Sequence, residues 1–282
     1  MTRVLLLCLM LGLASVACGT APPKADKGPA GGAAVDELFI NPNANDAQKG
    51  VQALKLFRQA QATASGGDPV AAVDLYRKAL KLYEELDDAP AQAAIHNDLG
   101  LMLKAAGQLD KARGLLERAV SLAQKGTEPL ILAEAQLNLG LVHYEMGQDD
   151  AAMMRLSDAL ASASKAKAAE LQGLAYNARG NIHRRAGAHD KAIEDYRQAT
   201  AAWTSLGRQD FAAVSVMNVG YCQVMQGKTD AAAVTLQGAL DLLDKRSKAD
   251  SGPLAPHIQD LIHLIKTDPA AARQKVDKAL AQ

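Results

Sequence analysis

The stretch NDLGLMLKAAGQLDKARGLLERA, residues 97–119, decides the fold, because near copies of it follow at steps of 40 residues. Gly100 recurs as Gly140, Gly180 and Gly220, Gly107 recurs as Gly147, Gly187 and Gly227, and Asp110 recurs as Asp150, Asp190 and Asp230. Two alanine columns extend the register to six units, numbered in chain order: Ala72, Ala112, Ala152, Ala192, Ala232 and Ala272, and Ala79, Ala119, Ala159, Ala199, Ala239 and Ala279. The chain is therefore a repeat array.

Each unit is predicted to form two helices. Apolar residues recur at helical spacing on both sides of Gly107, for example from Leu99 to Leu103 and again from Leu109 to Ala119. Gly107 is expected to end the first helix in a left-handed turn, and Asp110 falls in the first turn of the second helix, where the helix dipole favours an anion. The unit is thus an antiparallel hairpin.

The small residues predict a close crossing of the two helices. Gly100 on the first helix and Ala112 and Ala119 on the second leave little bulk between the helices, so the backbones are expected to approach closely. A leucine at position 112 should wedge the pair apart.

The spacing of Gly100, Gly107, Ala112, Leu116 and Ala119 resembles that of the tetratricopeptide repeat, in the extended form of about 40 residues. It is similar to repeats in kinesin light chains and in scaffolds that modulate G proteins. The resemblance covers residues 46–282 and implies an all-α solenoid of about six hairpins that forms a right-handed superhelix. The outer units depart from the pattern as terminal units do: Ala60 and Asp260 replace the first glycine, and Thr267 replaces the second.

The N-terminus reads as an export signal. In residues 1–17, Arg3 precedes an apolar run, and the small residues that follow end at Cys18. This resembles a bacterial lipobox, with Ser15 where leucine is usual, and implies lipidation of Cys18. An ordinary signal-peptidase site, which would release a soluble exported protein, is the alternative. Residues 18–45, rich in Gly, Ala and Pro, are expected to be a tether. We expect a lipid anchor in the outer membrane, facing the periplasm.

Composition and missing motifs narrow the function. The 31 basic and 31 acidic residues cancel, so no basic field favours nucleic acid. We find no P-loop, dinucleotide fingerprint or zinc-type cysteine pair, and expect neither enzymatic activity, a metal nor a cofactor. His143 and His183 occupy equivalent positions that usually hold packed aromatic residues, and Cys222 is expected to be a small buried residue.

The resemblance implies that the first helices line a concave groove. Its groove positions lie three residues before and one, four and five residues after the first glycine. They correspond to Asn97, Leu101, Lys104 and Ala105; Leu137, Leu141, Tyr144 and Glu145; Asn177, Asn181, Arg184 and Arg185; and Met217, Tyr221, Val224 and Met225. Asn138 and Asn218 match asparagines that hold the main chain of a bound peptide in related scaffolds.

Two groups of groove residues suggest ligand chemistry. Met217, Tyr221, Val224 and Met225 would form a soft apolar surface if they are open to water, and Arg184 and Arg185 could receive an acidic group. The alternative is that these residues contact neighbouring units.

We therefore expect a non-enzymatic scaffold that binds a peptide segment of another envelope protein. A narrower possibility is an assembly factor resembling pilotins, the lipoproteins that help place secretins in the outer membrane. An exported small-molecule sensor or enzyme is the alternative from another class.

Overall fold

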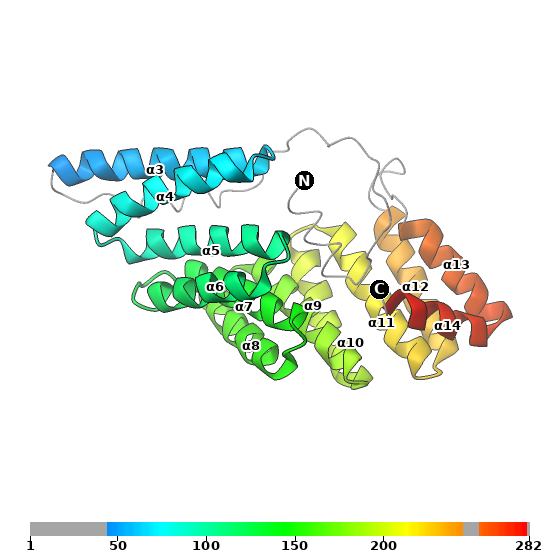
Figure 1. The fold of residues 1–282 in the computed structure, drawn as a ribbon. Helices are drawn as coiled ribbons and strands as arrows, with labels where there is room; N and C mark the ends of the chain where they lie inside the picture. Colours follow the sequence, from blue (N-terminus) through cyan, green and yellow to red (C-terminus); the bar gives the residue numbers. More distant parts are fainter. Residues whose placement is uncertain (1–43, 245–253, 281–282) are drawn as a thin grey trace.

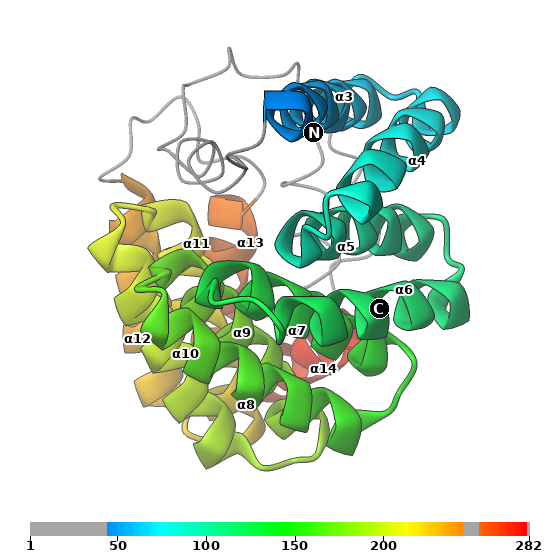
Figure 2. The same cartoon turned by 90° about the vertical axis from the view of Figure 1, so that its left-hand side faces the viewer.

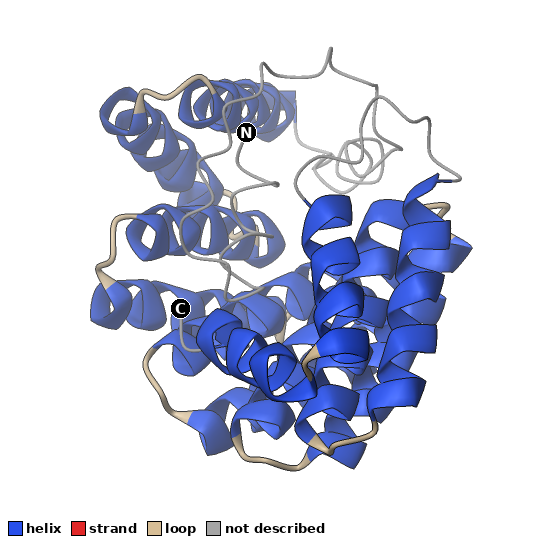
Figure 3. Ribbon diagram, turned by 90° about the vertical axis from the view of Figure 1, so that its right-hand side faces the viewer, coloured by secondary structure: helices blue, strands red, loops and turns tan. Residues whose placement is uncertain are grey.

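The computed structural model describes residues 44–244 and 254–280, and this part of the chain consists of α-helices joined by short turns, with no strand (Figure 1, Figure 3). The helices are α3 (Ala44–Ser65), α4 (Pro69–Glu85), α5 (Ala89–Ala105), α6 (Leu109–Ala123), α7 (Pro129–Glu145), α8 (Asp149–Lys165), α9 (Ala169–Arg185), α10 (His189–Ser205), α11 (Gln209–Met225), α12 (Thr229–Asp244), α13 (Leu254–Thr267) and α14 (Pro269–Leu280).

The helices pair in chain order into six hairpins, from α3 with α4 to α13 with α14. Each second helix also packs on the first helix of the next unit, and α7 contacts both α5 and α9. In Figure 2 the first helices α5, α7 and α9 lie toward the inside of the curved stack and the second helices toward the outside. The predicted all-α solenoid of about six hairpins is confirmed.

The turns inside the hairpins form as predicted. Gly107 has a φ of 72°, which L side chains rarely adopt, and Gly67, Gly147, Gly187 and Gly227 share this left-handed backbone. Asp110 lies in the first turn of α6. The unit-one helix α3 begins at Ala44, two residues before the predicted start of the solenoid.

The hairpin crossing is close at the glycine, as predicted, and it also holds a large side chain of the second helix. A Cβ atom on Gly100 would lie 2.7 Å from the Leu116 side chain, and Gly140, Gly180 and Gly220 face Leu156, Tyr196 and Leu236 in the same way. The glycine therefore makes room for a large side chain of the second helix. Backbone atoms of that helix also lie close to the Cβ position, 3.5 Å away at Gly100 and 3.3 Å away at Gly140. The alanines that share a column with Ala112 are fully buried in all six units, so this column is the tightly packed part of the crossing.

Cys222 is buried and forms no disulfide within the described part of the chain, as predicted for a small core residue. Burial raises the pKa of its thiol to about 12, so the thiolate is not formed near neutral pH.

The predicted signal, Cys18 and the tether before residue 44 lie outside the described residues. Within the described residues, no helix combines the length and the apolar character that a membrane span requires.

Candidate functional site

The first-helix residues that the sequence analysis assigned to a groove are mostly buried. Asn97, Lys104, Asn138, Asn177, Asn181, Met217, Asn218 and Tyr221 are each less than a tenth exposed. Tyr144, Arg184 and Met225 are half-buried, and Arg185 is exposed. The contacts of each group decide which of them could still meet a ligand.

The asparagines of units two and three bind each other. The Asn138 amide on α7 donates to the Asn97 side-chain oxygen on α5 over 2.8 Å. Next to Asn97, the Asp98 carboxylate accepts from the Tyr76 hydroxyl over 2.9 Å and from Gln61 over 3.0 Å. Burial raises the pKa of Asp98, and these hydrogen bonds partly oppose the rise. This network joins units one, two and three.

Lys104 has an internal counterion. Its ammonium group lies 2.5 Å from the Glu145 carboxylate of the next unit, and the lysine side chain is almost fully buried. Lys104 and Glu145, both predicted groove residues, therefore tie α5 to α7.

The Arg185 side chain also has partners within the chain. Its guanidinium forms an ion pair with Asp149 at the start of α8 and stacks 4.3 Å from the centre of the Tyr144 ring. A shallow, open depression lined by residues 147–151 lies beside Asp149. Arg185 thus links units three and four at an exposed edge.

Arg184 is different, because no ion pair among the described residues includes it. The described residues hold five half-buried arginines, and the other four, Arg113, Arg155, Arg179 and Arg208, each lie within 4.0 Å of a carboxylate. The Arg184 Nε donates to the Tyr196 hydroxyl over 3.2 Å, and that hydroxyl donates to Asn181 over 2.7 Å. The two terminal amino groups of Arg184 have no protein acceptor in the described residues.

Asn218 carries a second donor without an acceptor. Its side-chain amide nitrogen is buried and makes no hydrogen bond within the described residues, whereas the equivalent Asn138 is bonded. The neighbouring Asn177 oxygen accepts from Ser215 over 3.1 Å. Burial raises the pKa of Tyr221, and the positive charge of Arg184 partly opposes this rise. The charge of Arg184 is therefore felt at Tyr221 on α11, the helix that also carries Asn218. Donor groups without an acceptor among the described residues therefore occur on both α9 and α11, which the Ser215–Asn177 hydrogen bond joins.

The proposed apolar surface is not open to water. Met217, Tyr221 and Val224 are at most 2% exposed and share one core cluster with Ile258 on α13 and Val276 on α14. Met225 packs on the edge of the same cluster. For these residues the contact with a neighbouring unit, which was the alternative, is what the structure shows.

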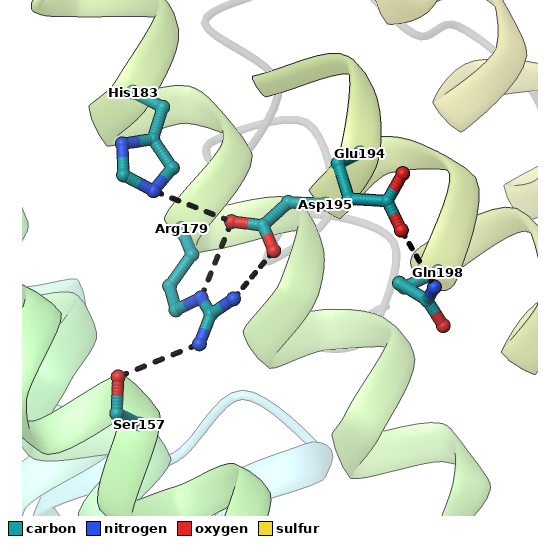
Figure 4. A network of polar contacts seen from close by, with 6 residues as sticks. All are labelled: Ser157, Arg179, His183, Glu194, Asp195 and Gln198. Atoms are coloured by element: carbon teal, nitrogen blue, oxygen red, sulfur yellow. Dashed lines mark hydrogen bonds and ion pairs between the residues drawn. The ribbon is translucent and has the colours of Figure 1, made fainter. Parts of the chain in front are cut away.

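Sequence reasoning missed a polar network in unit four (Figure 4). Arg179 on α9 binds the buried Asp195 on α10 through two hydrogen bonds of 2.5 and 3.2 Å, and reaches Ser157 on α8 over 3.5 Å. The equivalent positions of unit two are Leu99 and Leu115, so two charges sixteen residues apart replace an apolar pair. The simultaneous replacement of both leucines by residues of opposite charge is the sequence feature from which the ion pair could have been predicted.

The two histidines of interest have structural contacts. The His183 Nε2 lies 3.7 Å from Asp195, and burial lowers the pKa of His183 although the Asp195 charge opposes the shift. The His143 Nδ1 lies 2.6 Å from the Gln148 side-chain oxygen. Within residues 44–244 and 254–280, no group of three or more His, Cys, Asp or Glu side chains could hold a metal ion.

Comparison with known proteins agrees with the hairpin architecture. A family model described as tetratricopeptide repeat matches residues 51–125 and 171–245, and a second model of the same description matches residues 134–165. No curated protein matches the sequence.

Solved structures share the fold at low identity. The apo form of RapI aligns with a TM-score of 0.67 and 14% identity over 82% of this chain and 83% of that chain. Aspartyl phosphate phosphatase F from Bacillus subtilis aligns with a TM-score of 0.63 and 11% identity over 84% of this chain and 61% of that chain. Nearly identical repeats similar to the tetratricopeptide repeat (TPR-like repeats), from a kinesin light chain of Podosopora anserina, align with a TM-score of 0.55 and 18% identity over 70% of this chain and 98% of that chain.

Identities this low show the fold alone, whereas the family models cover more than half of the sequence and fall on the observed hairpins. The chain belongs to the tetratricopeptide repeat family, a family of protein-interaction scaffolds.

Proposed function

We propose that this protein is a non-enzymatic adaptor of the bacterial cell envelope, which binds an acidic peptide segment of a partner protein between α9 and α11. The observation that carries the proposal is Arg184, the one half-buried arginine of the described residues without a carboxylate partner.

A partly buried charge without a counterion is unfavourable, because the charged group has lost part of its hydration and no paired anion compensates for that loss. A carboxylate from a ligand would meet the two free amino groups of Arg184 in the paired geometry that guanidinium and carboxylate groups favour. The bond from Arg184 to Tyr196 holds the guanidinium in place before the ligand arrives.

Asn218 suggests how the rest of the segment is held. The Asn218 amide donor is costly because it is buried without an acceptor, and a main-chain carbonyl of an extended peptide would satisfy it once α9 and α11 move apart enough to admit the peptide. Asn97 and Asn138 satisfy each other, and Lys104 and Arg185 have internal counterions. We therefore assign binding to Arg184 and Asn218, and assign the other four residues to the support of the helices.

The affinity test compares two arginines. The partner is first identified by crosslinking in native membranes, and its acidic segment is then titrated into the wild-type chain, Arg184→Gln and Arg197→Gln. Arg197 on α10 is exposed and serves as the charge-matched control. Because a hydrogen bond to a charged group contributes about 1.5 to 3 kcal/mol, Arg184→Gln should weaken binding by roughly tenfold to a hundredfold. Equal affinities of the three chains would contradict the proposal.

The envelope location is part of the proposal and rests on the sequence around Cys18. When cells that express the protein are grown with labelled palmitate, the purified protein should carry the label. The Cys18→Ser variant should carry no label and should no longer be found in the membrane fraction. A wild-type chain that carries no lipid would remove the anchor from the proposal and leave the binding site untouched.

The narrower role, assembly of an outer-membrane secretin, has its own test. A deletion strain should fail to assemble its secretins if the adaptor serves them, and normal assembly would rule that role out.

A further inference from the structure

The junction between units one and two is looser than the later junctions. Of the five described pairs in which a second helix packs on the next first helix, α4 and α5 are the least closely packed. Ile95 on α5 gives a reason, because it is fully buried in the unit-one cluster, whereas the later units bury the smaller Ala135, Ala175 and Ser215 at the same position. The larger side chain holds α4 away from the α5 backbone.

The looser packing leaves three apolar side chains half-buried: Leu80 on α4, and Leu99 and Met102 on α5. They lie at the edge of the unit-one cluster, and we call them the junction surface. Apolar residues at the same positions of later units are at most 8% exposed, as in Val120 and Leu160, Leu139 and Val219, and Val142 and Ile182. The junction surface is therefore apolar area that the later junctions bury and this one does not.

The junction surface is separate from the predicted groove. The groove positions of unit two are Asn97, Leu101, Lys104 and Ala105, and none of them belongs to the junction surface. Leu80 lies on a second helix, which carries no predicted groove position.

The chain before α3 brings an apolar segment within reach of this surface. Residues 38–40 are Leu, Phe and Ile, and Ile40 stands four residues before Ala44, where α3 begins. Four residues span at most about 14 Å. The start of α3 lies beside the end of α4, because Lys49 binds Glu85 over 2.9 Å, and Figure 1 shows both ends at the left of unit one. Leu80 is five residues from Glu85, or about 7.5 Å along the helix.

The charges on either side of the two apolar groups are complementary. Asp36 and Glu37 directly precede the apolar segment, and the exposed Lys78 and Lys81 stand beside Leu80 on α4. Opposite charges at the margin of an apolar contact favour one pairing over others. The acidic residues thus favour α4 as the surface that the segment meets.

We propose that residues 38–40 dock on the junction surface of the same chain, with Phe39 placed between α4 and α5. The short connection to α3 holds the segment near its site at an effective concentration in the millimolar range, which favours this occupant over a second copy or a partner. The docking goes beyond the peptide site at Arg184 and does not depend on it. With the lipid on Cys18 proposed above, it would also turn unit one toward the membrane.

The position of the segment is tested with a photo-crosslinking analogue of phenylalanine at Phe39 in the purified full chain. Illumination should link it within one chain to the peptides that carry Leu80 or Leu99. The same analogue at Ala30, outside the apolar segment, is the control and should not form these links. A link from Phe39 to another part of the solenoid, to a second copy or to lipid alone, or no link at all, would overturn the proposal.

Competition in trans gives a second measurement. Phe39→Asp should release the segment, whereas Ala33→Asp adds the same charge outside the apolar residues. A fluorescent peptide of residues 33–43, AAVDELFINPN, should bind the Phe39→Asp chain at least tenfold more tightly than the Ala33→Asp chain, whose own segment occupies the surface. A peptide that itself carries Phe39→Asp should not bind. Equal binding of the unmodified peptide to the two chains would also overturn the proposal.

Discussion

Asn138 on α7 donates a 2.8 Å hydrogen bond to Asn97 on α5, and both side chains are buried. The two amides form a link between units two and three, so the geometry gives them a structural role before any ligand is considered. Removing one of them leaves a buried polar atom of the other without this hydrogen bond, which is more costly than the loss of an exposed hydrogen bond.

Asn138→Ala should therefore lower the free energy of unfolding by about 1 to 3 kcal/mol. Asn97→Ala should act in the same direction, and the double variant should lose less than the sum of the two, because both changes remove the same bond. Urea unfolding followed by circular dichroism measures this. Strict additivity of the two changes would show that the residues do not interact.

Gly180→Ala should destabilise the hairpin of unit four, because the new Cβ would lie 2.7 Å from the Tyr196 ring. Overpacking of this kind costs about 1 to 3 kcal/mol. Gly114→Ala on α6 is the matched control, since nothing lies within 4 Å of its Cβ position. In a helix interior, alanine in place of glycine should stabilise by up to about 1 kcal/mol. Thermal unfolding of the two variants should thus shift in opposite directions.

The ion pair of Arg179 and Asp195 should be sensitive to the loss of one member only. Asp195 is almost fully buried, so Arg179→Leu leaves a buried carboxylate without its arginine, with only the His183 ring 3.7 Å away, and should cost about 3 to 5 kcal/mol. The double variant Arg179→Leu with Asp195→Leu recreates the leucines that unit two has at these positions and should recover most of that loss. A double variant less stable than Arg179→Leu alone would contradict this account.

His96 should make the protein less stable in acid. Burial, with a smaller effect of the Arg118 charge, lowers the pKa of His96 from 6.5 to about 4, and neither ring nitrogen has a hydrogen-bond partner in residues 44–244 and 254–280. Between those two values the unfolded chain binds a proton that the folded chain does not bind. The stability contributed by neutral His96 is therefore complete above pH 6.5 and is lost as the pH falls toward 4.

His96→Leu places at this position the residue type that unit one has at Leu56. It should reduce the slope of unfolding free energy against pH between pH 6.5 and 4, and leave the slope above pH 7 unchanged. Denaturant titrations at a series of pH values check this, and an unaltered slope in the acid range would show that His96 is not the group involved.

The 40-residue period was sufficient to predict the hairpins, their turns and the order of the units. The turn at position 107 needs a backbone conformation that only glycine adopts at low cost, and the close packing of the helices needs alanine at fixed positions. Both requirements can therefore be recognised in the sequence as residues that recur every 40 positions.

The candidate site was harder to predict, because the availability of each side chain to a ligand depends on the partners that it has in the folded chain. Arg184 and Arg185 are neighbours in the sequence, yet among the described residues only Arg185 has a carboxylate partner. The repeat pattern contains no information on where the Asp149 side chain points. Met217 and Tyr221 are buried in a cluster that includes residues of α13 and α14, and the repeat pattern of unit five alone does not contain these contacts.

A photo-crosslinking amino acid tests the central claim, binding of a partner on the inner first helices, most directly. It is placed in turn at Met225, which is half-buried on α11, and at Val234, which is 75% exposed on the second helix α12. Illumination of native membranes should link the partner to the chain that carries the probe at position 225 and not to the chain that carries it at position 234. A partner linked only through position 234 would contradict the account.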